Sequence, residues 1–219
     1  MYKHLWIRRI FTLLFFLGLV GTVTLIGTTH PAHAQVRTNA DASSAIQYAD
    51  SYCNCADAAC SSTINAGDAQ PNFECAEFVA RALAAEGLVP RLDSSSPQSN
   101  FQRYTASDGN TYNLLWPSSN NSGGGGGGIR GLEDYLLNTG IGTDIGDSPS
   151  QAAPGDVVFY YANSNHTSII VDTSNGPVVD AHNVAEYHIE YTEGGPAYFS
   201  GYAGRTIVLI QGNTTNPGS

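Results

Sequence analysis

Hydrophobic residues in the first half of the chain recur at helical spacing. In the segment 42–53, the positions i, i+3, i+4 and i+7 are held by Ala45, Tyr48, Ala49 and Tyr52, which predicts a helix with one buried face. A second helix is predicted over 74–86, with Asn72 as N-cap and Gly87 as terminator. A third, shorter helix is predicted over 130–138, before Gly140.

The spacing changes beyond residue 150. Runs rich in β-branched and aromatic residues are separated by Asn, Ser and Gly clusters, and they predict strands at 157–161, 167–171, 178–181 and 206–210. Their short connections favour antiparallel neighbours, and Pro154-Gly155-Asp156 predicts a turn before the first strand. Helices followed by a meandering sheet indicate an α+β fold.

One stretch lacks any regular pattern. Residues 90–128 are rich in Ser, Asn, Pro and Gly and end in six consecutive glycines, so we expect a long mobile loop whose glycine-rich part covers about 118–128.

The N-terminal residues have the pattern of an export signal. Basic residues precede an apolar run over 10–26, and Ala32-His33-Ala34 supplies small residues before Gln35. This predicts a secretory signal peptide, residues 1–34, and a secreted protein; an uncleaved membrane anchor is the alternative. The mature part, residues 35–219, is long enough for one catalytic domain, with a core at about 42–211.

The charge of the mature chain limits its partners. Three of the nine basic residues lie in the predicted signal, which leaves six against nineteen acidic groups, a formal charge of −13. This argues against nucleic acid and, after signal cleavage, against a membrane surface as a partner. We expect a monomer without a cofactor.

Four cysteines allow two opposed interpretations. In an exported protein an even count usually means disulfides, and a bridge of Cys53 or Cys55 with Cys60 is the simplest one. The spacing C-x-C-x4-C of Cys53, Cys55 and Cys60 matches no common zinc pattern, so no metal site is expected. Cys75 is then either a nucleophile, or a structural thiol or half of a disulfide.

Cys75 and His166 have positions that suit catalysis. Cys75 falls at the start of the second helix, where unpaired N–H groups and the helix dipole stabilise a thiolate and an oxyanion. His166 opens a predicted strand, and we expect its imidazole at a sheet edge as a base for the thiol. An isolated surface histidine is the alternative.

The next strand offers groups that could orient His166. Asp180 and His182 are two residues apart and point to the same face of a regular strand, whereas Asn183 points to the other. We expect His182 first, then Asp180, and Asn183 last.

Three segments together resemble a known family. Phe73-Glu74-Cys75-Ala76-Glu77-Phe78-Val79 resembles the D-C-x-x-F-V helix of amidase domains related to the NlpC-type and CHAP cysteine peptidases. Pro154-Gly155-Asp156-Val157 and His166-Thr167-Ser168-Ile169-Ile170-Val171 resemble their P-G-D and H-x-x-I-V strands. The resemblance implies a papain-like fold, with helices packed on an antiparallel sheet, Cys75 as nucleophile and His166 as base. It puts the third catalytic position on Asp180 and His182.

The sequence departs from that family pattern at Glu77. From the sequence we expect a carboxylate so close to the thiol to weaken the nucleophile.

The interpretation is therefore a secreted cysteine hydrolase that cleaves an amide or peptide bond, with peptidoglycan peptides implied as substrate by the resemblance. The alternatives are an inactive binding module of the same fold with all four cysteines bridged, and a thiol acyltransferase or transpeptidase.

Overall fold

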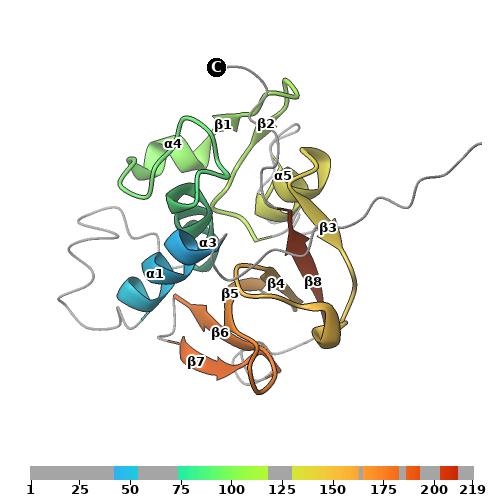
Figure 1. The fold of residues 1–219 in the computed structure, drawn as a ribbon. Coiled ribbons are helices and arrows are strands. Elements are labelled where there is room, and N and C mark those ends of the chain that lie inside the picture. Colours follow the sequence, from blue (N-terminus) through green and yellow to red (C-terminus); the bar gives the residue numbers. More distant parts are fainter. Residues whose placement is uncertain are drawn as a thin grey trace, which may run out of the picture. The chain divides into compact units, whose positions relative to one another are not determined.

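The computed structural model describes residues 42–53, 74–117, 130–162, 165–182, 186–192 and 203–211 (Figure 1). All of them belong to one compact unit, residues 34–219. Several predictions fall outside the described residues: the signal peptide, Asn72, Cys55, Cys60, the glycine-rich segment and Asn183. Within the described ranges, no helix has the length and apolar character needed to cross a membrane.

The three predicted helices are present with slightly shorter bounds. They are α1 (Ser43–Tyr52), α3 (Glu74–Ala85) and α5 (Leu132–Asn138). Helix α3 ends as predicted at Gly87, whose positive φ of 77° lets the chain turn while Gly87 and Leu88 donate to carbonyls of the last helical turn. The carboxylate of Glu86 accepts the N–H of Ala45 at 3.1 Å, so the end of α3 caps the start of α1.

The main sheet has six antiparallel strands in the order β3-β8-β4-β5-β6-β7. Four of them match the prediction within two residues: β4 (Val157–Tyr161), β5 (His166–Asp172), β6 (Val178–Ala181) and β8 (Gly204–Ile210). The sequence did not reveal β3 (Gly142–Asp144) and β7 (Glu186–Glu190). Both lie at the sheet edges, where pairing on one side does not require an apolar run.

The prediction of a long loop over 90–128 is wrong for its described part. That part contains α4 (Gln98–Gln102) and the hairpin of β1 (Tyr104–Thr105) and β2 (Thr111–Tyr112). Phe101, Tyr104 and Tyr112 are buried, and the edges of both tyrosine rings meet Tyr135 of α5. These three aromatic anchors order a segment whose average composition is that of a loop.

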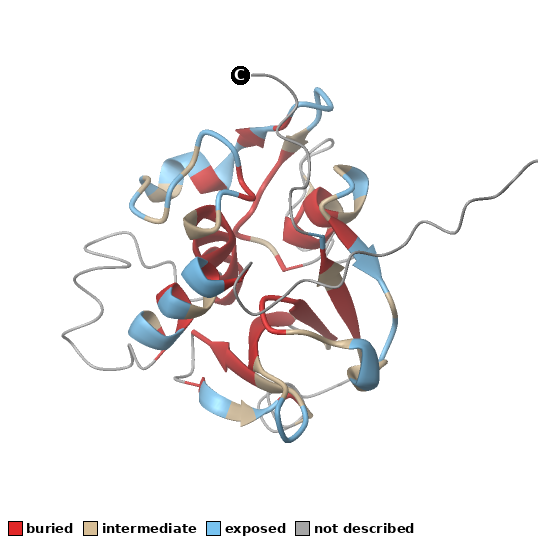
Figure 2. Ribbon diagram, in the orientation of Figure 1, coloured by how far each residue is buried: buried red, intermediate tan, exposed pale blue. Residues whose placement is uncertain are grey.

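The helices α1, α3 and α5 pack on one face of the sheet and share one hydrophobic core with it. Helices α1 and α3 pack on β5 and β6, and α5 packs on β3 and β8. On the helix side the strands bury Val157, Phe159, Ile169 and Val171; on the other side they bury Val158, Tyr160, Ile170, Val179 and Ile207. Buried residues therefore occupy α3 and the central strands, whereas much of α1 and β7 is exposed (Figure 2).

The predicted turn at Pro154-Gly155-Asp156 is present, and Asp156 has a structural part in it. One carboxylate oxygen accepts the N–H of Ala153 at 2.7 Å, and the other accepts that of Ile210 at 2.8 Å. The buried carboxylate thus joins the turn before β4 to the end of β8, the strand that pairs with β4.

Candidate active site

Cys75 is the second residue of α3 and is only 3% exposed. It is a thiol and takes no part in a disulfide. Its position in the first helical turn is the one predicted, where backbone N–H groups have no partner within the helix. Cys75 is therefore not bridged to Cys53, the other cysteine that the structure describes.

Cys53 differs from Cys75 in its surroundings. It is also a buried thiol, at the end of α1, and its Sγ lies 3.8 Å from the carbonyl oxygen of Asp50. Because Cys55 and Cys60 lie outside the described residues, the predicted short bridge stays a prediction.

His166 is the first residue of β5. The sequence predicted an imidazole at a sheet edge, but the side chain is buried. Its ring stacks on Tyr160 of β4, with centroids 5.8 Å apart. Burial alone would lower the His166 pKa, but a hydrogen bond with Cys75 and the nearby carboxylate of Glu186 raise that pKa to about 9. The imidazole is therefore held in its charged form next to the thiol.

Glu186 is the group beside His166 that sequence reasoning missed. Its Oε2 lies 3.6 Å from Nε2 of His166, and each side chain is 2% exposed. Glu186 begins β7 and stands opposite Ala181 in the β6–β7 hairpin. The register between these strands shifts after Val179, so alternation along the sequence could not have placed Glu186 against His166.

The sheet register separates Asp180 from His166. Asp180 lies opposite Ile169, whereas His166 lies opposite Tyr160, at the start of β5. Asp180 accepts the backbone N–H of His188 at 2.7 Å, and its burial raises its pKa to about 6. Its surroundings are thus the end of α1 and the strand β7.

His182 follows the end of β6 and is also buried. Its ring stacks against Phe78, one turn after Cys75 on α3, with centroids 6.0 Å apart. It therefore lies on the helix side of the sheet, close to the helix that carries the thiol.

Glu77 does not present an unpaired negative charge to the site. Nε and Nη2 of Arg81 donate to one of its oxygens at 2.9 and 2.6 Å, and Gln98 donates to the other at 3.0 Å. Both charged side chains are buried. Arg81, one turn further along α3, therefore neutralises the Glu77 charge that the sequence placed near the thiol.

A family comparison covers the segments that carry Cys75, His166 and Glu186. The family model described as Putative amidase domain matches residues 39–203, which include α1, α3 and the strands β4 to β7. The chain belongs to this family. Membership supports an amide hydrolase. No curated protein and no solved structure matches the chain significantly.

Proposed function

We propose that this amidase-family chain is a secreted cysteine hydrolase in which Cys75 is the nucleophile, His166 the general acid and base, and Glu186 the third member of the triad. One observation carries the proposal: a buried histidine interacts with a thiol in the first turn of a helix and with a buried carboxylate.

The first half-reaction forms an acyl-enzyme. The Cys75 thiolate attacks the carbonyl carbon of the amide, and the negative oxygen that forms is stabilised by N–H groups at the start of α3. The His166 imidazolium then gives its proton to the amide nitrogen, the C–N bond breaks, and the amine leaves. Cys75 is left as a thioester and His166 as a neutral base.

The second half-reaction restores the enzyme. Neutral His166 takes a proton from water, and the hydroxide attacks the thioester carbon. The C–S bond breaks, so a carboxylic acid leaves and the thiolate–imidazolium pair forms again. Through both steps the Glu186 carboxylate fixes the orientation of the ring and stabilises its positive charge.

This assignment replaces His182 and Asp180 as the proposed third group. Asp180 is directed to α1 and His188, and His182 stacks on Phe78. We propose that His182 lines the helix side of the site. We also propose that the domain is related to the papain-like NlpC and CHAP peptidases, because a thiol at the start of a helix packs on an antiparallel sheet that carries the histidine.

The proposed substrate is an amide bond of peptidoglycan, either within its peptides or between the muramoyl group and alanine. The support is the family resemblance of the segments that carry Cys75 and His166. The charge of −13 in the predicted mature chain means that local contacts must bind an anionic wall fragment.

The test is digestion of purified muropeptides by the wild type and by Cys75→Ala, with mass spectrometry of the products. We expect fragments that together have gained one water per bond cleaved, from the wild type alone. If simple peptide amides are hydrolysed but muropeptides are not, the thiol mechanism stands and the substrate is wrong. If Cys75→Ala digests either at the wild-type rate, the mechanism is wrong.

A further inference from the structure

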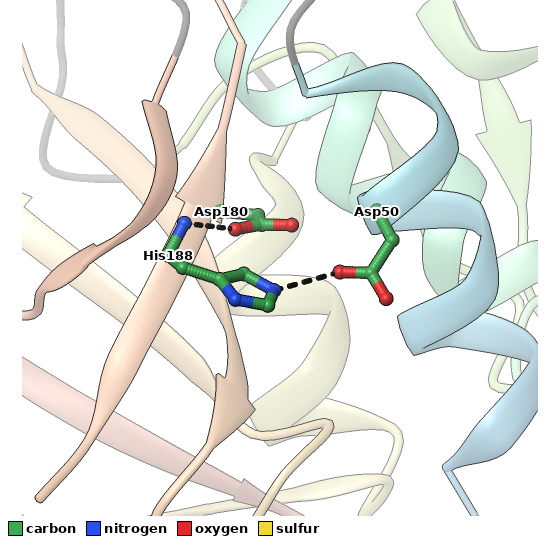
Figure 3. A group of neighbouring side chains, drawn as sticks. All are labelled: Asp50, Asp180 and His188. Carbon is green, nitrogen blue, oxygen red and sulfur yellow. Dashed lines mark hydrogen bonds and ion pairs between the residues drawn. The ribbon is translucent and has the colours of Figure 1, made fainter.

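A second group of polar side chains lies at the junction of α1, β6 and β7 (Figure 3). Asp50 comes from the last turn of α1, Asp180 from β6 and His188 from the middle of β7. One carboxylate or imidazole atom of each residue lies within 4.8 Å of the others. Three elements distant in sequence thus bring two carboxylates and an imidazole together.

Asp180 is a costly group in this place unless a positive charge accompanies it. The residue is fully buried. Oδ1 accepts the N–H of His188, while Oδ2 is buried and accepts no hydrogen bond from a nitrogen or oxygen of the described residues. Burial opposes the charge of Asp180; the backbone N–H and the imidazole of His188, and then the thiol of Cys53, a weak donor, favour it. In Figure 3 this second oxygen points to the side on which Asp50 lies.

The partly exposed members of the group complete an open site. Nε2 of His188 lies 2.9 Å from Oδ1 of Asp50, and the side chains are 40% and 42% exposed. The ring of Tyr187 stacks on the imidazole, with centroids 4.1 Å apart, and holds its plane. A cation that entered from solvent would replace the proton shared by Nε2 and Oδ1 and would gain the buried Asp180.

We propose that Asp50, Asp180 and His188 bind a divalent transition-metal cation of the zinc type. Imidazole nitrogen with two carboxylates is a ligand set that suits Zn²⁺ and its neighbours, whereas Ca²⁺ and Mg²⁺ favour sites made of oxygen alone. Three protein ligands and exposed flanks leave room for water as a further ligand. The cysteine motif considered in the sequence contributes none of these three ligands.

The position of the site gives the cation a structural part. It would join α1 to β7, the strand that begins with Glu186 only two residues before His188. A bound cation therefore fixes the hairpin that carries the carboxylate beside His166. The binding itself does not depend on the proposed hydrolase activity.

The experiment measures Zn²⁺ binding to the full mature chain in the Cys75→Ala background, which removes the thiol beside His166 as a competing ligand. Equilibrium dialysis with metal analysis gives the stoichiometry, and thermal unfolding gives the stabilisation by bound metal. Asp50→Asn and His188→Gln are added separately, and Asp134→Asn, on the partly exposed part of α5, is the matched control.

We expect Zn²⁺ to bind and to raise the melting temperature, and Ca²⁺ to do neither. Each ligand variant should weaken binding by more than the roughly 10- to 100-fold typical of removing an outer-shell partner, while Asp134→Asn binds as before. Co²⁺ at the site should give no sulfur-to-cobalt charge-transfer band. Absence of binding, equal affinity in the ligand variants, or a thiolate band that persists in them overturns the proposal.

Discussion

The molecule contains two histidine–carboxylate pairs near one hairpin, and they differ in burial. His166 and Glu186 are 2% exposed, whereas His188 and Asp50 are about 40% exposed. In the buried pair, the low dielectric makes each charge depend on its partner, and removal of one leaves the other unsatisfied. In the exposed pair, water and salt screen the attraction, and open sides remain for a ligand.

The same contrast holds for the arginine pairs. Arg81 and Glu77 are buried on α3, while the pair of Arg205 and Asp147 has an Asp147 side chain that is 45% exposed. Arg81 also donates to the carbonyls of Ser94 and Ser96 at 2.8 and 2.7 Å. The buried charges thus gather around the helix that carries Cys75, which fits a site where electrostatics must be fixed in advance.

The largest effect is expected from Cys75→Ala, because in the proposed mechanism His166 and Glu186 act through this thiol. Amide hydrolysis should fall by at least about 10⁴-fold, as for loss of a triad nucleophile, with an unchanged circular dichroism spectrum. Cys53→Ala is the matched control and should keep its activity. Iodoacetamide should label Cys75 faster than Cys53; the reverse order would contradict a reactive Cys75.

Arg81→Met tests the cost of a buried charge without its partner. It leaves the Glu77 carboxylate without its cation, and the free energy of unfolding should fall by about 3–5 kcal/mol. Urea denaturation measures the loss. Arg205→Met, at the more exposed pair, should cost about 1 kcal/mol or less. Similar losses in the two variants would mean that burial does not distinguish the pairs.

The raised pKa of His166 predicts how the protein depends on pH. Because the folded pKa of about 9 exceeds the ordinary value near 6.5, protonation of His166 favours the folded state. That stabilisation is complete below about pH 6.5 and is lost as the pH rises through 9. Activity should decline over the same alkaline range as the imidazolium disappears. Unfolding and rate profiles between pH 6 and 10 measure both, and a rate still rising at pH 10 would contradict the ion pair.

Glu186→Gln separates the charge of the carboxylate from its shape. We expect kcat/KM to fall by about 10²-fold, within the range for acid–base groups. The alkaline limb of the pH profile should move to lower pH, because Glu186 no longer raises the His166 pKa. Glu133→Gln, at another buried glutamate, which accepts the hydroxyl of Tyr161 at 2.6 Å, is the control. An unchanged pH limb in Glu186→Gln would remove Glu186 from the triad.

The smallest effect is expected at the exposed pair without metal. Asp50→Asn should change the free energy of unfolding by about 1 kcal/mol at most, because surface ion pairs contribute little. Chemical denaturation in the presence of a chelator measures it, against Asp134→Asn. A loss as large as that of Arg81→Met would show that the two kinds of pair are energetically alike.

Local patterns were sufficient for most of the framework. The helices α1, α3 and α5 could be predicted because each buries one face and so has apolar residues at helical spacing. The strands β4, β5, β6 and β8 could be predicted from their β-branched runs, because they lie in the buried part of the sheet. The edge strands β3 and β7 were not, because a strand paired on one side needs no apolar run. The segment with α4 and the β1–β2 hairpin was not, because a few aromatic anchors order it rather than a periodic pattern.

The candidate site divides in the same way. The sequence by itself determined that Cys75 begins a helix and that His166 begins a strand, since helix starts and β-rich runs are local features. Only the tertiary structure decided that Glu186 meets His166, that Arg81 neutralises Glu77, and that Asp50 meets His188, 138 residues away. The physical reason is that strand register, a shift within the hairpin and the packing of α1 on the sheet bring these charges together, and none of these is encoded in local spacing.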